Sequence, residues 1–387
     1  MGNALRIIVL ASGISLATQD LAVAQVGEGT RTIPPEFGYR PSEIWFRSIT
    51  VNGFAEGSYG YNFNQPDSGT NTLRVFDFDD SKVKLDVFEL VAQRPIKERG
   101  EIGFRFDAEY GQSIPKVSAA SGIFRGLGTG EAEDYDLQQA FVSWIAPVGD
   151  GLRIEAGKFV TPFGYEVIEG YDGYNDNQTR SFLFGFAIPF THSGVRASYA
   201  FAKEFSATVM AVQGWDNFHD NNDARTFGAQ FALTPTPDLS ISLTAMGGPE
   251  RKDDVKDDRF LYDLTSTWKA TQQFTLGLEC LYGNEERFLA NGDNATWSGG
   301  AGYLRWNFTD TASVALRAEE FDDKDGSRTG TAQKLKSFTL TPQATLSKNM
   351  VLRGDLRGDW SDVDVFEDGS GLSGNQITAS VSLLLMF

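Results

Sequence analysis

The chain has 387 residues, a formal net charge of −18 and a single cysteine, Cys280. The negative charge argues against a nucleic-acid partner, because such partners are held by basic surfaces, and against a pore built to collect anions. One cysteine excludes an internal disulfide. The 41 glycines and 13% aromatic residues suit strands, tight turns and aromatic belts at a membrane surface.

The N-terminus has the layout of a secretory signal peptide. Arg6 is followed by an apolar stretch over 7–17 and by the small-residue cleavage pattern Ala-Val-Ala at 22–24. We expect residues 1–24 to be a signal peptide and residues 25–48 to be a periplasmic lead-in. The apolar stretch is too short and too soon interrupted for a membrane-spanning helix.

From residue 49 onward the side chains alternate between apolar and polar, a period typical of β-strands. The alternating runs indicate about sixteen strands, each long enough to cross a membrane at barrel tilt, for which roughly nine to eleven residues suffice. The expected strands are 49–63, 82–94, 101–111, 134–146, 151–160, 192–203, 205–215, 223–234, 238–249, 258–270, 273–284, 294–308, 311–322, 333–347, 349–361 and 374–387.

The alternation separates an apolar face from a charged face. In 349–361, Leu352 and Trp360 share one face, and arginines and aspartates occupy the other. In a membrane barrel the apolar face meets lipid and the charged face lines a wet lumen, whereas a soluble sandwich points its apolar face inward. The strand length, the strand number and the signal peptide favour the barrel. Strands 82–94 and 134–146 do not alternate cleanly, and a β-bulge in each would explain this.

Short turns such as 203–204 alternate with long loops such as 161–191, the outer-membrane pattern of periplasmic turns and external loops. The last strand carries an apolar face that runs to Phe387, and such a terminus resembles the signal read by the barrel assembly machinery. We therefore expect an all-β protein, with one transmembrane antiparallel β-barrel over 49–387. Its predicted place is the bacterial outer membrane, among lipids and lipopolysaccharide.

Several segments resemble one known family. They are GFAEGSYGYNFNQP at 53–66, GKFVTPFGYE at 157–166, PFTHSGVR at 189–196 and LRAE at 316–319. Their order is similar to that in the OmpL-like putative β-barrel porins, and the resemblance covers nearly all of the chain after the signal peptide. It implies a porin-type barrel but no particular solute. Phosphate-selective porins share a stretch like 157–164, but this chain lacks the basic clusters expected for their anion.

The longest connection, 161–191, follows the fifth expected strand. In general porins the corresponding loop folds toward the lumen and narrows it, and the resemblance implies the same arrangement here. The phenylalanines of the loop need a packing partner, which the inner wall would supply. Acidic side chains at a constriction favour cations. The charged residues of this expected constriction are Glu166, Glu169, Asp172, Asp176 and Arg180. The alternative is an external, solvated acidic loop.

The expected pore wall carries both signs of charge. The candidates on the polar faces are Arg105, Asp107, Glu109, Arg153, Glu155, Arg196, Glu279, Arg317, Glu319, Arg353, Asp355, Arg357 and Asp359. Two interpretations are open for them. Either arginines on one side face acids on the loop and create a transverse field, or the charges form a structural lattice of salt bridges.

No catalytic, cofactor or metal site is expected, because the chain has no P-loop, dinucleotide fingerprint, nucleophile elbow or Cys/His cluster. The predicted function is a porin for passive diffusion of small hydrophilic solutes, with a cation preference. The alternatives are an anion- or sugar-selective channel, with Tyr165, Tyr171 and Tyr174 as candidate sugar contacts, a hydrolase at His192, and a plugged structural or adhesin barrel. A homotrimer is the assembly considered, because general porins often form one.

Overall fold

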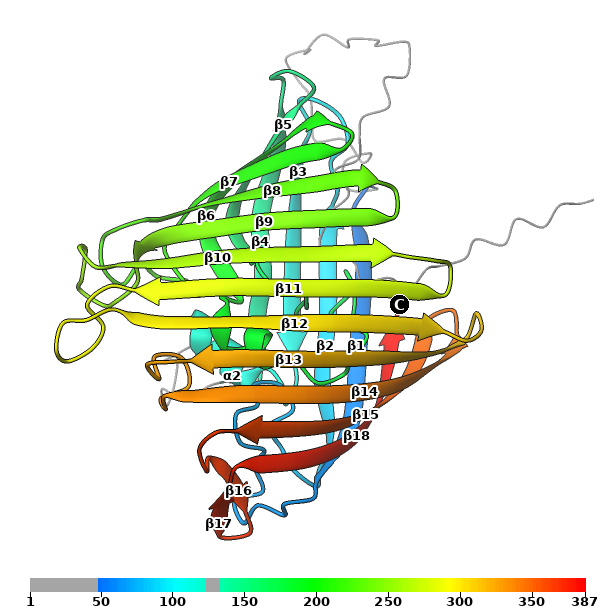
Figure 1. The fold of residues 1–387 in the computed structure, drawn as a ribbon. Coiled ribbons are helices and arrows are strands. Elements are labelled where there is room, and N and C mark those ends of the chain that lie inside the picture. The colour runs from blue at the N-terminus through cyan, green and yellow to red at the C-terminus, as the bar shows by residue number, and fades with distance from the viewer. Residues whose placement is uncertain (1–47, 123–132) are drawn as a thin grey trace, which may run out of the picture.

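The computed structural model describes residues 48–122 and 133–387. These residues form a closed barrel of sixteen antiparallel strands (Figure 1). The expected signal peptide and all but the last residue of the expected lead-in lie outside the described residues. The barrel expected from the sequence is confirmed, and its strands begin and end within a few residues of the expected positions.

Strands that neighbour one another in the chain also pair in space, and β1 closes the barrel against β18. The barrel strands are β1 (Thr50–Asn62), β2 (Val83–Arg94), β3 (Ile102–Tyr110), β4 (Tyr135–Ala146), β5 (Leu152–Val160), β6 (Thr191–Ala202), β7 (Phe205–Val212), β8 (Thr226–Thr236), β9 (Leu239–Pro249), β10 (Asp258–Lys269), β11 (Phe274–Glu285), β12 (Ala295–Asn307), β13 (Ala312–Asp323), β14 (Gln333–Ser347), β15 (Met350–Ser361) and β18 (Asn375–Met386).

The remaining described elements lie in the loops of one rim. They are the helix α2 (Pro115–Ser121), the π-helix η1 (Leu183–Ala187) and the hairpin of β16 (Phe366–Asp368) with β17 (Gly371–Ser373). The opposite rim has only short turns, so the rim with long loops is the external one. No helix in the described part of the chain is long and apolar enough to span a membrane.

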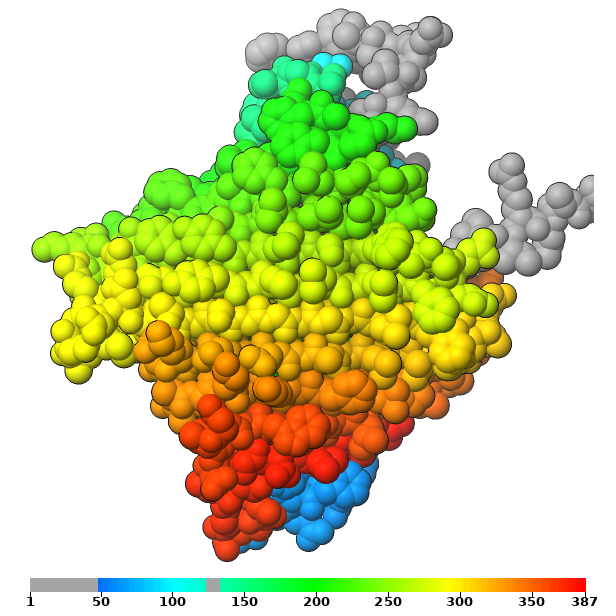
Figure 2. All heavy atoms as spheres, viewed as in Figure 1, coloured from blue at the N-terminus to red at the C-terminus, as the bar shows by residue number. Residues whose placement is uncertain are grey.

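The barrel presents apolar side chains outward and charged side chains inward. On β15, Leu352 and Trp360 are 39% and 46% exposed, whereas Arg353 and Asp355 between them are buried. Cys280 is also exposed on the outer face of β11. Figure 2 shows the outer face of the barrel as a continuous surface over β8–β15. This is the reverse of a soluble sandwich, because the apolar face has lipid rather than a partner sheet to meet.

β-Bulges interrupt the two strands whose alternation is unclear in the sequence. In the β1–β2 pairing, Glu56 lies opposite Val87 and Gly57 opposite Leu85, so Asp86 is an extra residue. In the β3–β4 pairing, Gln138 is the extra residue in the same way. Each bulge turns two successive side chains inward, and the inward face changes from even to odd positions beyond it. Both expected bulges are confirmed.

The β2 bulge depends on Gly111, which directly follows β3. A Cβ atom at this position would overlap the carbonyl group of Asp86 and crowd the Cα of Val87. Only glycine therefore lets the backbone after β3 approach the bulge this closely.

Replacing Gly111 with alanine should lower the free energy of unfolding by about 1–3 kcal/mol, the usual cost of overpacking. Gly302→Ala is the matched control, because a Cβ there meets nothing within 4 Å. Thermal unfolding in detergent, followed by circular dichroism, would measure both. An equal melting temperature for the two variants would contradict the role given to Gly111.

Candidate pore and constriction

The β5–β6 connection, residues 161–190, lies inside the barrel. Glu166 places Oε1 2.6 Å from Nη1 of Arg317 on β13, and its Oε2 accepts hydrogen bonds from the backbone and hydroxyl of Ser181 at 2.7 and 2.6 Å. Glu169 lies 2.7 Å from Arg353 on β15. Because these wall arginines are far from the loop in sequence, their contacts show that the loop folds toward the lumen, as expected.

The other charged loop residues are paired as well. Asp172 lies 2.7 Å from Arg105, Asp176 is paired with Arg305, and Arg180 lies 3.3 Å from Glu169. Every one of the four loop carboxylates thus has an arginine partner, and Asp172 alone keeps a largely exposed side chain, 48%. These four loop carboxylates are therefore not the free ring of negative charge that their sequence suggests.

Glu169 is the most strongly held of these groups. Arg353 bridges it to Glu56 on β1, which lies 2.5 Å away. Burial by itself would raise the pKa of Glu169, but the guanidinium groups of Arg180 and Arg353 hold this pKa well below its usual range. The carboxylate therefore stays charged inside the barrel, and the ion pairs tie the loop to two strands at once.

Wall carboxylates also bind the loop through its backbone. Asp355 accepts from the backbone N–H of Gln178 at 3.2 Å and of Thr179 at 2.8 Å, and Glu319 accepts from Phe182 at 2.7 Å. At the end of the loop, Asp216 accepts from two backbone N–H groups, and burial raises the pKa of Asp216 to about 6. Buried acceptors thus satisfy backbone donors that a loop inside a barrel would otherwise leave unpaired.

The loop phenylalanines pack into an apolar core inside the external half of the lumen. Phe182, Phe184 and Phe190 are buried, and Phe186 packs against them. The core also takes aromatic and aliphatic side chains from the wall, such as Trp297 of β12. The expected packing partner of these phenylalanines is therefore the inner wall, and part of the lumen is dry.

The candidate wall residues all lie on the inner face, and most of them form ion pairs with one another. The pairs along or across strands are Arg105–Asp107 at 2.8 Å, Arg153–Glu155 at 3.0 Å, Arg196–Glu155 at 2.5 Å, Arg317–Glu319 at 3.6 Å and Arg357–Asp359 at 2.7 Å. A lattice of salt bridges, one of the two interpretations left open by the sequence, is present.

Six buried carboxylates on the barrel strands have no ion-pair partner among residues 48–122 and 133–387. Two of them, Asp323 and Asp355, accept several hydrogen bonds from backbone and hydroxyl donors. The other four are Glu89, Glu109, Asp263 and Glu279, and we call them the unpaired wall carboxylates. Sequence reasoning missed Glu89 because the β2 bulge breaks the alternation that would have shown it. Asp263 was also missed, although β10 alternates regularly. That alternation would have placed Asp263 on the inner face.

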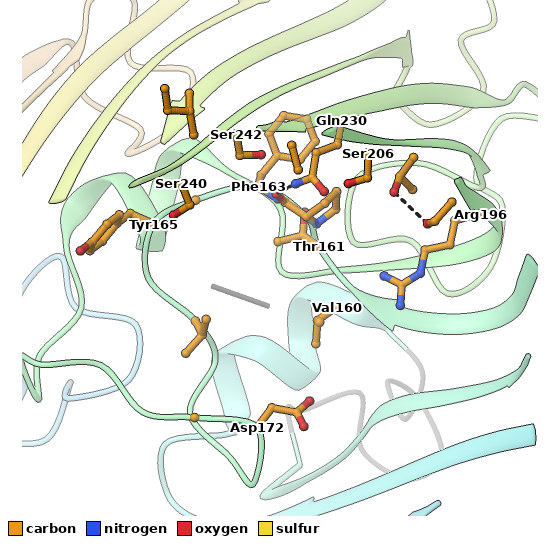
Figure 3. A pocket seen from close by; sticks show the side chains of 18 of the residues that line it. Val160, Thr161, Phe163, Tyr165, Asp172, Arg196, Ser206, Gln230, Ser240 and Ser242 are labelled. Atoms are coloured by element: carbon orange, nitrogen blue, oxygen red, sulfur yellow. Dashed lines mark hydrogen bonds between the residues drawn. The ribbon is translucent and has the colours of Figure 1, made fainter. Parts of the chain in front are cut away.

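A cavity of about 380 Å³ lies between the loop and the wall formed by β4–β9. Hydroxyl and amide side chains line the wall, among them Ser206, Gln230 and Ser240. Figure 3 shows Asp172 of the loop across the cavity from Gln230, Ser240 and Ser242, with Arg196 at a third side. The cavity reaches Lys203 in the short β6–β7 turn, so it extends toward the periplasmic rim.

A second, smaller cavity of about 30 Å³ lies beyond the loop. Ile168 lines both cavities, so the loop separates them. Glu89 lines the larger cavity and Glu109 the smaller one. These two residues lie directly opposite each other on β2 and β3. The pair therefore lies on the part of the wall between the two cavities.

Tyr165, a candidate sugar contact, lines the larger cavity (Figure 3) but is almost fully buried. Its ring stacks on Tyr303 with centroids 4.1 Å apart, and a Cβ at Gly277 would overlap it. His192 lies at the start of β6 and is buried, with its ring nitrogens 3.0 Å from the Thr161 hydroxyl and 3.1 Å from the Gly214 carbonyl. Both ring nitrogens of His192 are thus engaged, and neither contact is with a serine hydroxyl that could act as a nucleophile. In the described residues no group of His, Cys, Asp and Glu is arranged to hold a metal ion.

Comparison with known proteins gives one family and many solved structures. A sequence model of the family described as putative beta-barrel porin-2, OmpL-like, matches residues 48–387. An anion-selective porin from Comamonas acidovorans is 15% identical, with 88% of this chain and 99% of that chain covered and a TM-score of 0.59. The outer membrane channel DcaP of Acinetobacter baumannii is 11% identical, with 88% and 97% covered and a TM-score of 0.59.

The trimer form of OmpT, an outer membrane protein of Vibrio cholerae, is 9% identical, with 88% of this chain and 99% of that chain covered and a TM-score of 0.55. At these identities the likenesses show a shared fold. No curated protein sequence matches the chain.

Arg353→Gln should destabilise the barrel strongly, because it leaves Glu56 buried without a partner and Glu169 with Arg180 alone. Breaking a buried pair in this way costs roughly 3–5 kcal/mol. Asp172→Asn removes one partner of a half-exposed pair and should cost less than about 1 kcal/mol. Urea unfolding midpoints in detergent would compare the two. Similar midpoints would show that the Arg353 cluster does not hold the loop.

Proposed function

The chain belongs to the family of OmpL-like putative beta-barrel porins, as its sequence motifs predicted, and we propose that it lets small hydrophilic solutes diffuse passively with a preference for cations. A channel of the bacterial outer membrane follows from the family and from the closed sixteen-stranded barrel. Family and fold are those of a channel rather than an enzyme. The solute class and the ion preference are the proposed part.

The charge balance inside the barrel supports the cation preference. Each candidate wall arginine is already paired with a carboxylate, for example Arg353 with Glu169 and Arg317 with Glu166. The unpaired wall carboxylates have no such compensation among the described residues. A carboxylate in such a place is ionised only when a cation or water compensates it, so these groups offer binding positions to cations and not to anions.

The larger cavity supports passage of small hydrophilic solutes. Its wall offers short hydroxyl and amide side chains such as Ser206, Thr208 and Gln230. Ser198 and Thr208 share a hydrogen bond of 2.8 Å across β6 and β7. Such a surface can form hydrogen bonds with many polar solutes in place of water, but it is not complementary to one particular solute. This is the lining expected of a general channel rather than of a tight binding site.

An anion-selective channel is the second candidate, favoured by one observation. Glu155 is shared by Arg153 and Arg196, at 3.0 and 2.5 Å, so this part of the wall has one positive charge in excess. Arg196 lines the larger cavity and could attract anions there. The single excess charge is outnumbered by the unpaired wall carboxylates, so we rank this candidate second.

The export and assembly steps complete the proposal. The signal peptide at 1–24, the lead-in at 25–48 and recognition of Phe387 by the barrel assembly machinery rest on the sequence pattern. The outer-face apolar belt supports contact with lipids and lipopolysaccharide. A homotrimer is proposed because a barrel of the same fold is described in a trimer form.

Single-channel recording in a planar bilayer under a KCl gradient tests the ion preference. We expect a steady conductance with a reversal potential on the cation side. Asp172→Asn, which removes an exposed loop charge beside the larger cavity, should move the reversal potential toward anions. Arg196→Gln should move it the other way, because it removes the excess positive charge of the wall.

An anion-side potential for the unaltered protein would favour the second candidate. Folded protein without any conductance would overturn the porin proposal and leave the plugged barrel. Folding is checked independently by the shift in gel migration between unheated and heated samples.

A further inference from the structure

The two bulges lie on the strands that flank β3, and both deliver extra side chains to the same patch of inner wall. The β2 bulge turns Asp86 inward beside Val87, and the β4 bulge turns Gln138 inward beside Gln139. Gln138 donates a hydrogen bond of 2.5 Å to Oε1 of Glu109 on the strand between them. Bulges often re-aim side chains next to functional sites, and here they gather around Glu109.

Glu109 lacks the partners that a buried carboxylate needs. It is 3% exposed, and its Oε2 has no hydrogen-bond partner among the residues that the structure describes. Its direct cross-strand neighbour is a second buried carboxylate, Glu89. Like charges directly opposite each other on a sheet destabilise it, so this arrangement calls for a positive charge or a proton between or beside them.

Asp86 repeats the feature at the same cavity. It is 7% exposed, with Oδ1 bonded to the Ser113 hydroxyl at 2.9 Å and lying 3.2 Å from Lys84. Its Oδ2 has no hydrogen-bond partner within 48–122 and 133–387. Asp86 and Glu109 both line the smaller cavity of about 30 Å³, which is large enough for a water molecule or an ion of similar size.

We propose that this cavity binds one small inorganic cation, held by Glu109 Oε2 and Asp86 Oδ2 together with water. Carboxylate, hydroxyl and water oxygens are the ligands of hard cations such as Ca²⁺. The described residues form no ready-made metal centre, so the cation keeps part of its hydration shell and is bound reversibly. Glu89, which faces the larger cavity, would be the neighbouring position on the way in.

The site rests on the proposed function and extends it. A permeating cation binds transiently at the patch of inner wall between the two cavities. A cation held there also explains why the protein tolerates Glu89 and Glu109 face to face. The ion supplies the charge that the wall arginines, all engaged elsewhere, do not.

Calorimetric titration of the folded protein in detergent with CaCl₂ tests the site without relying on transport. The acidic external loops can bind Ca²⁺ as well, so the readout is the difference between variants. Glu109→Gln should remove one binding event per chain, and Asp86→Asn should weaken the same event at least tenfold. Asp310→Asn, which removes an exposed carboxylate in the short turn after β12, should change nothing.

A second measurement links the site to transport. Millimolar CaCl₂ added to KCl should reduce the single-channel conductance of the unaltered protein and of Asp310→Asn, but not that of Glu109→Gln. Glu109→Asp, which keeps the charge on a shorter side chain, should retain a weakened form of both effects. It also keeps the test valid if Glu109→Gln does not fold.

The two proposals can fail separately. A conducting, cation-preferring protein whose Ca²⁺ binding is the same in Glu109→Gln, Asp86→Asn and Asp310→Asn would overturn the site and leave the porin proposal standing. A protein that never conducts, yet loses one Ca²⁺ on Glu109→Gln, would keep the site and overturn the porin proposal.

Discussion

Charged groups buried inside the barrel must find partners, and this constraint shapes the lumen. A carboxylate removed from water is costly unless a positive charge or several hydrogen-bond donors compensate it. The loop after β5 meets the requirement by bringing its acids to arginines on the opposite wall, as Glu169 does with Arg353. The same pairs that make the buried charges tolerable also fix the loop inside the barrel.

The pairing divides the lumen into two unlike parts. On the side of β12–β15 and β1 the loop is tied down by ion pairs. On the side of β4–β9 no ion pair among the described residues holds the loop, and the larger cavity remains there. The larger cavity stays open because the ion pairs with wall arginines hold the loop against other strands.

The bulges on β2 and β4 show how a local irregularity changes the chemistry of a wall. A regular strand presents every second side chain to the lumen, so neighbours on one face are fixed by the pairing register. An extra residue changes which positions face inward and places two inward side chains in succession. This is how Asp86 and Gln138 come to lie beside Glu109, a grouping that regular strands would not produce.

The sequence by itself determined the barrel, its strand number and the outward apolar face. These properties follow from a period of two and from loop lengths, which are local and can be read along the chain. The inward position of the loop was implied by the resemblance to a known family. The partners of the loop acids were decided only by the tertiary structure, since Glu166 and Arg317 are 151 positions apart. The same holds for Glu89, whose inward direction depends on a bulge that the alternation could suggest but not locate. Closure of the barrel brings such distant groups together, and the cost of burying unpaired charge then selects which of them meet.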